Sequence, residues 1–445
     1  MSNHRRETAP VPVSETTKQT GEMNTRWKWV EPSVWTPRML TALEQGVKGG
    51  KWFSLIDKVY ATANLAQAYT RVAANGGAAG VDHQTVQLYE RQLSANQEKL
   101  AAQLQDGSYR PQAVRRVWIE KPGSQEERPL GIPTIRDRVA QTALRNVLEP
   151  IFERDFAEHS YGFRPQRSTK QALRRVEALL KAGYTQVVDA DLKSYFDTIP
   201  HEPLLQRVEE KVSDGRVIKL LAAYLEQGVM DGLASWTPET GTPQGAVISP
   251  LLSNIYLDPL DHLLLKAGLE MVRYADDFVI MCRTETEARQ ALSCVQEWTV
   301  NNGLSLHPEK TRIVDATKAG GFDFLGYHFE RGYKWPREKS IKKLRATMRR
   351  KTRRTNGHAL STIIEDVNRT LQGWFEYFKH SHKTEFTQQD SWLRMRLRSI
   401  LRKRHGLAGR GRGADHQRWP NAYFATHGLF SLASARALLC QSSRR

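Results

Sequence analysis

Residues 273–281 read RYADDFVIM, two short apolar runs with the aspartates Asp276 and Asp277 between them. The flanks are rich in β-branched and aromatic residues, which predicts two strands joined by a tight turn. An Asp-Asp pair is common in turns, because short polar side chains hydrogen-bond their own backbone there. Two adjacent carboxylates also repel each other, and a bound cation relieves the repulsion. The stretch therefore indicates either a plain hairpin turn or part of a metal site whose third ligand lies elsewhere.

A second acidic segment upstream offers that ligand. Residues 185–200 read TQVVDADLKSYFDTIP, a short apolar run that contains Asp189 and Asp191 and predicts a buried strand leading into a turn. The two aspartates share one strand face, because side chains alternate. Magnesium prefers hard carboxylate oxygens. Two such ions about 3.5–4 Å apart can activate a 3′-hydroxyl and neutralise a triphosphate.

Charge is the strongest signal of the composition. The 445 residues include 66 Lys/Arg and 48 Asp/Glu, a net charge of +18. Such a balance indicates a polyanionic partner, most often nucleic acid. The excess is local, since residues 334–412 hold 22 Lys/Arg and 6 Asp/Glu, a net of +16. A merely solvated surface would spread the charge more evenly.

Several classes of protein are disfavoured. No apolar run reaches the roughly 18 residues of a membrane span, so no membrane partner is expected. Cys282, Cys294 and Cys440 are scattered and form no disulfide framework or zinc motif, which favours a reducing, cytoplasmic setting. Residues 1–22 are polar and lack the apolar core of a secretory signal, so we expect a disordered leader there.

Periodicity and turn signals predict the local structure. Helices are expected over residues 59–75, 137–155, 168–182, 201–227 and 285–302, and a hairpin over 113–135 with its turn at Pro122-Gly123. Strands are expected at 304–315 and 322–330, and basic helices follow from about residue 335. In IIEDVNRTLQGWFEYF, at 363–378, one apolar stripe indicates core packing rather than a ligand pocket. GLAGRGRG at 406–413 is typical of a flexible linker, which leaves a short tail at 414–445.

The motifs together resemble a reverse transcriptase. YADD (274–277) and DADLKSYFD (189–197) carry the resemblance first, and five further segments follow the order of the family's blocks: KPGSQEERPLGIPTIRDRVAQ (121–141), HSYGFRPQRST (159–169), GTPQGAVISPLLSNIYLDPLD (241–261), GLSLHPEKT (303–311) and FDFLGYHF (322–329). AYTRVAANGGAAGVDHQT (68–85) resembles the extra N-terminal block of group II intron-encoded and non-LTR enzymes. LQGWFEYF (371–378) resembles their maturase domain, domain X. The likeness covers roughly residues 50–445.

This resemblance implies an α/β (α+β) right-hand polymerase fold, with fingers, a palm sheet flanked by helices and an α-helical thumb. The domains expected are a leader and extension (1–50), fingers and palm (51–330), thumb or domain X (331–405), and a basic linker with a tail (406–445). The implied activity is RNA-directed DNA synthesis with two Mg²⁺ ions, for which Mn²⁺ can substitute. The implied partners are group II intron RNA, an RNA template with a DNA or RNA primer, a DNA target and dNTPs.

The family's roles carry over to matching residues. Catalytic carboxylates would be Asp191, Asp276 and Asp277, which with the Leu192 carbonyl would hold the metals. Asp189 rivals Asp191, which is favoured because it stands five residues before the aromatic Phe196. The nucleotide would contact Lys121, Arg128, Phe196, Gln244 and Gly245, and Lys310 would be the proton donor to pyrophosphate. Intron RNA would contact Lys342, Lys343, Arg345, Arg349, Arg350, Lys351, Arg353 and Arg354.

Plainer alternatives stay open. Phe196 could be core filler, Lys121 and Arg128 solvated side chains, and the basic run a solvated face. Two functional rivals are a splicing-only RNA-binding maturase and a host-domesticated reverse transcriptase used in repair or defence. The intact carboxylates favour the polymerase. We find no endonuclease module, and RWPNAYFATHGLFSL (418–432) resembles the closing segment of endonuclease-less bacterial intron proteins, which implies priming from replication forks.

Overall fold

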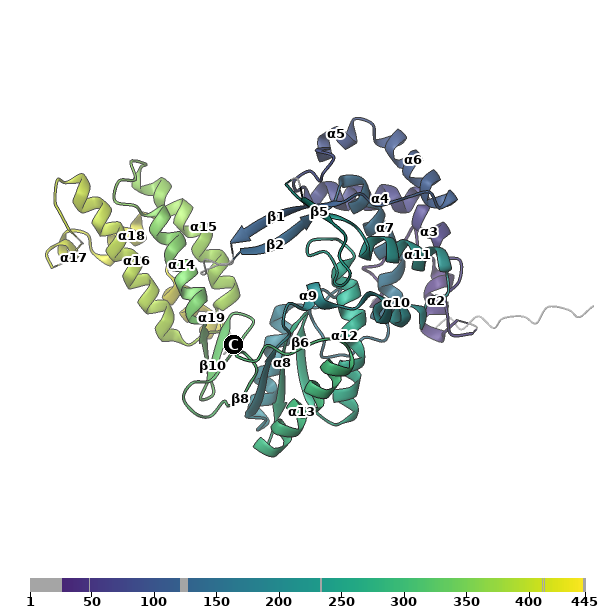
Figure 1. Ribbon diagram of the computed structural model, residues 1–445. Coiled ribbons are helices and arrows are strands. Elements are labelled where there is room, and N and C mark those ends of the chain that lie inside the picture. The colour runs from purple at the N-terminus through teal and green to yellow at the C-terminus, as the bar shows by residue number, and fades with distance from the viewer. Residues whose placement is uncertain are drawn as a thin grey trace, which may run out of the picture.

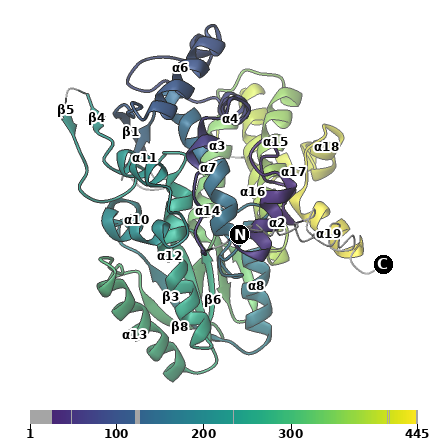
Figure 2. The same cartoon turned by 90° about the vertical axis from the view of Figure 1, so that its right-hand side faces the viewer.

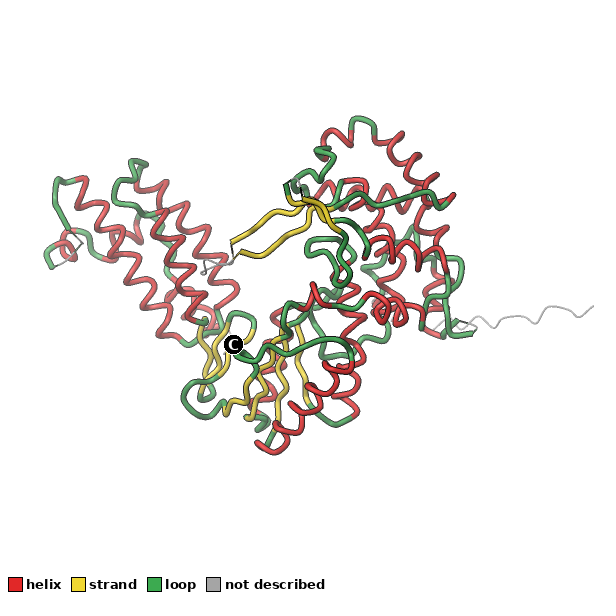
Figure 3. Tube along the Cα trace, viewed as in Figure 1, coloured by secondary structure: helices red, strands yellow, loops and turns green. Residues whose placement is uncertain are grey.

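The computed structural model describes residues 26–47, 49–120, 127–232, 234–409, 411 and 413–442. The chain forms an N-terminal helical body with a small sheet, a central body built on a second sheet, and a C-terminal helical body (Figure 1). Figure 3 shows the strands of the central sheet in the lower part of the view, beside the helices of the central body. The leader predicted at 1–22 lies outside the described residues.

The N-terminal body is mainly helical. Its helices are α2 (Pro37–Gln45), α3 (Ile56–Tyr60), α4 (Thr62–Asn75), α5 (Val86–Glu90), α6 (Leu93–Asp106) and α7 (Ile135–Glu153). Helix α7 begins where the Thr134 hydroxyl accepts a hydrogen bond from the Asp137 N–H, which satisfies one donor left free at a helix start. Helices α4 and α7 confirm those predicted over 59–75 and 137–155.

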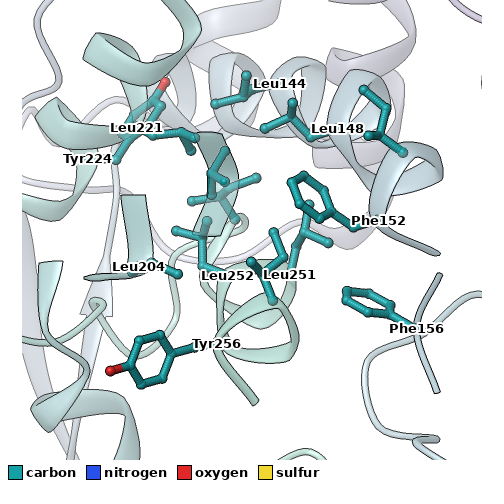
Figure 4. Packing of buried hydrophobic residues seen from close by; sticks show 14 of the residues in the cluster. Leu144, Leu148, Phe152, Phe156, Leu204, Leu221, Tyr224, Leu251, Leu252 and Tyr256 are labelled. Atoms are coloured by element: carbon teal, nitrogen blue, oxygen red, sulfur yellow. The ribbon is translucent and has the colours of Figure 1, made fainter. Parts of the chain in front are cut away.

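The largest hydrophobic core lies where this body meets the central one. Leu144, Leu148 and Phe152 of α7 pack there with Leu221 of α11 (Gly215–Leu225) and Leu251 of α12 (Ser249–Lys266) (Figure 4). All five side chains are buried. The N-terminal and central bodies therefore share one continuous core.

A four-stranded sheet extends the N-terminal body. Its order is β2-β1-β4-β5, from β1 (Val114–Glu120), β2 (Glu127–Ile132), β4 (Val229–Asp231) and β5 (Ala234–Trp236). Strands β1 and β2 are antiparallel and confirm the hairpin predicted over 113–135. Its turn at Pro122-Gly123 and the candidate Lys121 lie outside the described residues. In Figure 1 this hairpin extends toward the C-terminal helices.

The central sheet has the order β6-β7-β3-β8, and all its neighbouring strands are antiparallel. The strands are β3 (Gln186–Asp191), β6 (Glu270–Tyr274), β7 (Asp277–Cys282) and β8 (Arg312–Asp315). Side chains alternate between its faces. Val188 and Phe278 join the main core on one face, while Val187 and Val279 pack in a separate core on the other. Burial on both faces explains the near-continuous apolar runs around the aspartates.

Helices cover both faces of this sheet. They are α8 (Thr169–Lys181), α9 (Tyr195–Thr198), α10 (His201–Glu209), α11, α12 and α13 (Glu285–Asn301). Figure 2 shows α13 and α8 on opposite sides of the strands, and the two cores contain them accordingly. The helices predicted over 168–182 and 285–302 are confirmed.

The single helix predicted over 201–227 is wrong, because the chain forms two helices there. Asp214 lies between them, and its carboxylate accepts hydrogen bonds from the N–H groups of Arg216 and Val217. The same carboxylate accepts the N–H groups of Leu55 and Ile56. Asp214 is therefore the N-cap of α11. Through Leu55 and Ile56 it also connects this helix to the N-terminal body.

The strand regions before the C-terminal body differ in detail from the expectation. In 304–315 only β8 is a strand, since Leu306 forms a single bridge with Leu192. The stretch 322–330 is a hairpin, with Leu325 (φ 48°) and Gly326 (φ 82°) at its turn. A three-stranded sheet results, of order β11-β10-β9, from β9 (Phe322–Phe324), β10 (Tyr327–Glu330) and β11 (Tyr333–Pro336).

The C-terminal body has its own core. Its helices are α14 (Glu338–Lys351), α15 (Leu360–Phe378), α16 (Lys383–Arg404), α17 (Asp415–Arg418), α18 (Asn421–Thr426) and α19 (Leu432–Ser442). The predicted apolar stripe of α15 is buried from Ile363 to Phe378, which confirms its core role. Trp419, Phe424 and Leu432 complete this core, so the described part of the expected tail is an integral part of the helical body. No described helix is long and apolar enough to cross a membrane.

Candidate active site

The Asp-Asp turn lies at the end of the central sheet. Strand β6 ends at Tyr274 and β7 begins at Asp277, with Ala275 (φ 61°) and Asp276 as the two connecting residues. Asp191, the last residue of β3, is paired directly with Asp277. Opposed residues of antiparallel strands have Cα atoms about 4.5–5.5 Å apart. The sheet therefore brings together the carboxylates predicted from two distant segments.

Strand alternation assigns these carboxylates to faces. Asp189 and Asp191 stand on one face of β3, and the register places Asp277 on the same face of β7. Asp276 lies in the turn itself. Asp191 is about one third exposed because it stands at the strand end, whereas Asp189 is farther inside the sheet. This difference favours Asp191 over Asp189 as the residue that meets a substrate.

A buried arginine fixes the turn. Arg273 is fully buried and binds both carboxylate oxygens of Asp261 on α12, at 2.7 and 2.5 Å. Its Nη1 donates to the Ala275 carbonyl and to Oδ1 of Asn254, both at 2.9 Å. A buried ion pair in bidentate geometry is strong and directional. The backbone that carries Asp276 is therefore tied to helix α12.

Gly162 packs directly against the backbone of the same turn. A Cβ atom on Gly162 would lie 2.1 Å from the Ala275 nitrogen. The Gly162 carbonyl accepts a hydrogen bond from Nδ2 of Asn254. Only glycine allows the 159–169 segment to lie this close to the turn, which gives a physical reason for the SYGFRP motif.

Burial and mutual repulsion raise the pKa values of three of these carboxyl groups. Burial first, and then Asp276, Asp189 and Asp191, raise the pKa of Asp277 to about 7. Burial also raises the pKa of Asp189 to about 6, against the opposing effect of Arg312. The pKa of Asp276 is raised by burial, and Asp191 adds to the rise. A cation among these groups would relieve the repulsion.

Two basic side chains face the same group of acids. Lys310 donates from Nζ to Oδ2 of Asp191 at 2.7 Å, and Arg312 lies 3.4 Å from Oδ2 of Asp189. The segment that carries Lys310 is held by backbone pairing, since the His307 N–H donates to the Asp191 carbonyl. Lys310, expected as a proton donor, thus lies beside the carboxylate cluster.

The residues fit magnesium better than a metal held in a protein cage. Among the described residues, no group of three or more His, Cys, Asp or Glu side chains is placed so that it could hold a metal ion by itself. Magnesium is typically bound by one or two carboxylates with substrate phosphates completing its shell. Asp191 and Asp276, each within electrostatic reach of the other, provide such a set. Leu192, whose carbonyl was expected to help, is buried next to Asp191.

A cavity of about 540 Å³ is lined by Gln244 together with Arg116, Asp197 and Trp236. Gln244 lines it and donates from Nε2 to Asp197 at 3.1 Å. Gly245 has φ 106°, and a Cβ there would lie 2.5 Å from the Gly131 carbonyl. The 241–245 loop therefore needs its glycine to pack against strand β2.

Two other predicted nucleotide residues, Phe196 and Arg128, are chain neighbours of the lining residues Asp197 and Pro129. Phe196 is partly buried on α9, and its ring meets Phe163 edge-on at 6.3 Å. Arg128 is exposed on β2 and stands on the opposite face from Pro129, which lines the cavity. Its predicted contact with the triphosphate stays a prediction.

Sequence reasoning missed the floor of this cavity. Arg116 of β1 stacks on the ring of Trp236 of β5 at 4.6 Å, and Trp118 flanks it at 5.6 Å. Both tryptophans are more than one third exposed. Alternation in VRRVWIE places Arg116 and Trp118 on one face, which was a readable signal. The pairing of β4 with β1, which brings Trp236 there, was not.

The eight residues predicted to bind RNA do not share one surface. Five are exposed and define what we call the basic surface: Lys342, Lys343, Arg349, Arg350 and Arg353. The other three have partners within the chain. Arg345 donates to Gln389 at 3.0 Å, Lys351 pairs with Asp366 at 2.7 Å, and Arg354 donates to the Ser399 carbonyl at 3.4 Å.

Two known protein families match consecutive parts of the chain. The reverse transcriptase (RNA-dependent DNA polymerase) family matches residues 119–329, and the group II intron maturase-specific domain matches residues 341–419. The chain is 33% identical to protein YkfC of Escherichia coli (strain K12) over 346 residues, 68% of this chain and 86% of YkfC. It is 40% identical to group II intron-encoded protein LtrA of Lactococcus lactis subsp. cremoris over 176 residues, 40% of this chain and 29% of LtrA.

A solved structure is also similar. A partial Cas6-RT-Cas1–Cas2 complex matches with 26% identity and a TM-score of 0.36, over 56% of this chain and 41% of that chain.

The fold and the sequence matches define a reverse transcriptase. Within that class, the chain belongs to the group II intron-encoded reverse transcriptase/maturase family. The predicted α+β right-hand polymerase fold is confirmed. From here on the N-terminal, central and C-terminal bodies are called fingers, palm and thumb, the names that the resemblance implies.

Proposed function

We propose that the chain is an active RNA-directed DNA polymerase, which joins a dNTP to a primer 3′-hydroxyl on an RNA template. The observation that carries the proposal is the direct pairing of Asp191 with Asp277 beside a turn that presents Asp276. A splicing-only maturase has no need of these carboxylates. Their intact state therefore supports catalysis.

Two Mg²⁺ ions, with Mn²⁺ as a substitute, are the proposed cofactor; when bound they would lower the pKa of the primer hydroxyl and neutralise the triphosphate. Asp191, Asp276 and Asp277 would hold them with the Leu192 carbonyl. Lys310 would give its proton to the departing pyrophosphate oxygen. In the ligand-free chain the same ammonium forms an ion pair with Asp191.

The cavity lined by Gln244 and Asp197 is the proposed nucleotide site. Gln244 and the backbone at Gly245 would contact the nucleotide and template, and Phe196 would lie under the sugar. The bulk of Phe196 would exclude a ribonucleotide, because a 2′-hydroxyl would collide with the ring. Lys121 and Arg128 on the fingers hairpin would bind the triphosphate, as expected for charges suited to phosphate oxygens.

We also propose that the protein binds group II intron RNA and assists splicing and mobility. The maturase-domain match over 341–419 supports this role, and so does the exposure of the basic surface. The domain limits at residues 50 and 330 remain our proposal, as does a cytoplasmic location, which the free cysteines favour. A domesticated role in repair or defence is the rival, and an intron ribozyme around the gene would decide against it.

Polymerase activity is tested by primer extension on an RNA template. Asp276→Asn and Asp191→Asn should each abolish extension, because each removes a carboxylate from the proposed metal site while conserving side-chain volume. Asp189→Asn is the matched control, and its effect should be milder. RNA binding by the inactive variants should be unchanged. A near-normal rate for Asp276→Asn would reject the mechanism.

Intron-RNA binding is tested on the basic surface. Changing Lys343, Arg349, Arg350 and Arg353 together to Gln should weaken binding of a structured RNA and lower the slope of log K against log salt by up to about 3. Most such contacts are to phosphates. Lys351→Gln, which alters a lysine already paired with Asp366, is the control. Unchanged affinity and slope in the fourfold variant would show that RNA is bound elsewhere.

A further inference from the structure

A second cavity lies away from the carboxylates, between palm and thumb. It measures about 1010 Å³ and none of the candidate active-site residues lines it. Its walls come from the end of α8, the β10–β11 turn, the α15–α16 turn and helix α19. Cavities that bind small molecules are usually about 300–1,000 Å³. This one is therefore large enough for a ligand of nucleotide size.

Basic groups outnumber acids along its walls. Lys181, Lys334, Lys383 and Arg436 line it, with Glu177 as the single carboxylate. Glu177 is already paired with Lys334. The Nε of Arg436 is buried and has no hydrogen-bond partner in the described residues. Leaving such a donor unsatisfied is costly. The excess of lysine and arginine over carboxylate along the walls suits the cavity to an anion.

The pKa of His380, in the cavity wall, agrees with this excess of positive charge. Burial lowers the pKa of His380, and the neighbouring charges of Lys334 and Arg436 lower it further. Glu177 opposes this effect only in part, and Lys379 adds to it. Positive charges from β11, α19 and the end of α15 therefore converge without enough carboxylates to balance them.

The remaining lining is apolar and aromatic. Leu180, Phe329, Ala433 and Ala437 form apolar wall. The ring of Tyr333 is 58% exposed and meets the His382 ring edge-on at 5.2 Å. An exposed aromatic ring beside a positive pocket is the combination that binds a nucleobase by stacking and its phosphate by charge.

We propose that this palm–thumb cavity binds one nucleotide, with its base against Tyr333 and the apolar wall and its phosphate on Arg436 and Lys383. The same chemistry has two sources, a free nucleotide or an unstacked nucleotide of a bound RNA. Because the walls belong to both palm and thumb, the occupant contacts both bodies at once. Binding would then favour the palm–thumb arrangement in which the walls are close. The inference does not depend on polymerase activity.

The test uses the full chain and two probes, mant-GMP and a short single-stranded RNA that carries 4-thiouridine. Arg436→Gln and Tyr333→Ala should each weaken mant-GMP binding about tenfold or more. The first removes the proposed phosphate contact and the second removes the proposed base contact. Arg289→Gln, an exposed arginine on α13, is the control and should bind normally. If mant-GMP does not bind, photocrosslinking of the RNA to the peptides around Tyr333 or 433–440 identifies an RNA-borne nucleotide.

Two results would overturn the proposal. One is no mant-GMP binding at millimolar concentration together with no crosslink to either peptide. The other is binding or crosslinking that Arg436→Gln and Tyr333→Ala leave unchanged. Thermal unfolding checks that the variants fold, and Lys383→Gln, at an exposed position of the cavity, replaces Arg436→Gln if that variant is unstable.

Discussion

The Lys310 ammonium lies 2.7 Å from Oδ2 of Asp191, although the two residues are 119 positions apart in the chain. Backbone pairing produces this contact, because Leu306 bridges Leu192 and positions the loop that follows. Both side chains are partly exposed, at 61% and 34%, so the ion pair adds little to stability. The ion pair keeps Lys310, the proposed proton donor, next to the carboxylates where chemistry is proposed.

Lys310→Gln should lower the rate of single-nucleotide incorporation by about 10²-fold, which is typical for loss of a general acid. The KM for dNTP should change much less. Lys310→Arg keeps the charge near Asp191 and should recover part of the rate only if charge, rather than proton transfer, matters. Rapid-quench kinetics measure both, and an unaltered rate for the Gln variant would exclude a role as proton donor.

Gly162→Ala should impair catalysis about 10²-fold, because a Cβ there would collide with Ala275 and displace the turn that carries Asp276. Overall helix content by circular dichroism should stay the same. Gly373→Ala is the matched control, since nothing lies within 4 Å of its Cβ position, and this change should leave activity intact. Full activity in Gly162→Ala would mean that the turn tolerates the shift.

Phe196→Val should reduce the preference for dNTPs over rNTPs about tenfold or more, because it removes the bulk proposed to meet a 2′-hydroxyl. Incorporation from mixed nucleotide pools measures the ratio. Phe53→Val, at a 60% exposed ring, controls for loss of an aromatic side chain. An unchanged ratio would leave Phe196 as a packing residue next to Phe163 and Tyr195.

Glu149 should make stability depend on pH. Burial raises its pKa to about 7, with Arg145 opposing the rise. The folded chain therefore binds a proton that the unfolded chain has lost, so stability should fall as pH rises from about 4.5 to 7. Glu149→Gln should weaken that dependence, to which Asp189 and Asp277 also contribute, and gain about 1–3 kcal/mol at pH 8.

Thermal unfolding at pH 5.5 and pH 8 measures the effect of Glu149→Gln. Glu202→Gln, at an exposed position on α10, controls for the loss of one negative charge and should keep the pH dependence of the unmodified chain. Equal pH dependence in Glu149→Gln and the unmodified chain would show that another group is responsible.

Local patterns were enough to predict the strands around Asp191 and Asp276, because both faces of the central sheet are buried and their apolar runs are continuous. The break at Asp214 could also have been read, since Ser213-Asp214-Gly215 is a typical helix start. The longer apolar periodicity of 201–227 masked it. Resemblance to a family, rather than spacing, supplied Lys310 and Phe196.

Long-range packing was beyond the sequence. Nothing in the local pattern of β5 says that Trp236 will stack on Arg116, because β4–β5 joins the sheet through a parallel pairing with β1. The same holds for α19, whose Arg436 reaches the palm–thumb cavity only after the thumb core has assembled. The periodicity of a segment indicates which of its faces is apolar. Which element packs against that face is determined by the whole fold.

The composition of the thumb core also has a consequence for synthesis on the ribosome. That core joins Leu344 to Leu432, and translation at ~5–20 residues per second needs roughly 4–18 s to pass from one to the other. The main core is complete earlier, since its last fully buried member is Leu304. A nascent chain should therefore complete the core shared by fingers and palm while the apolar side of α15 is still uncovered. In that interval chaperones would find their binding site on the thumb.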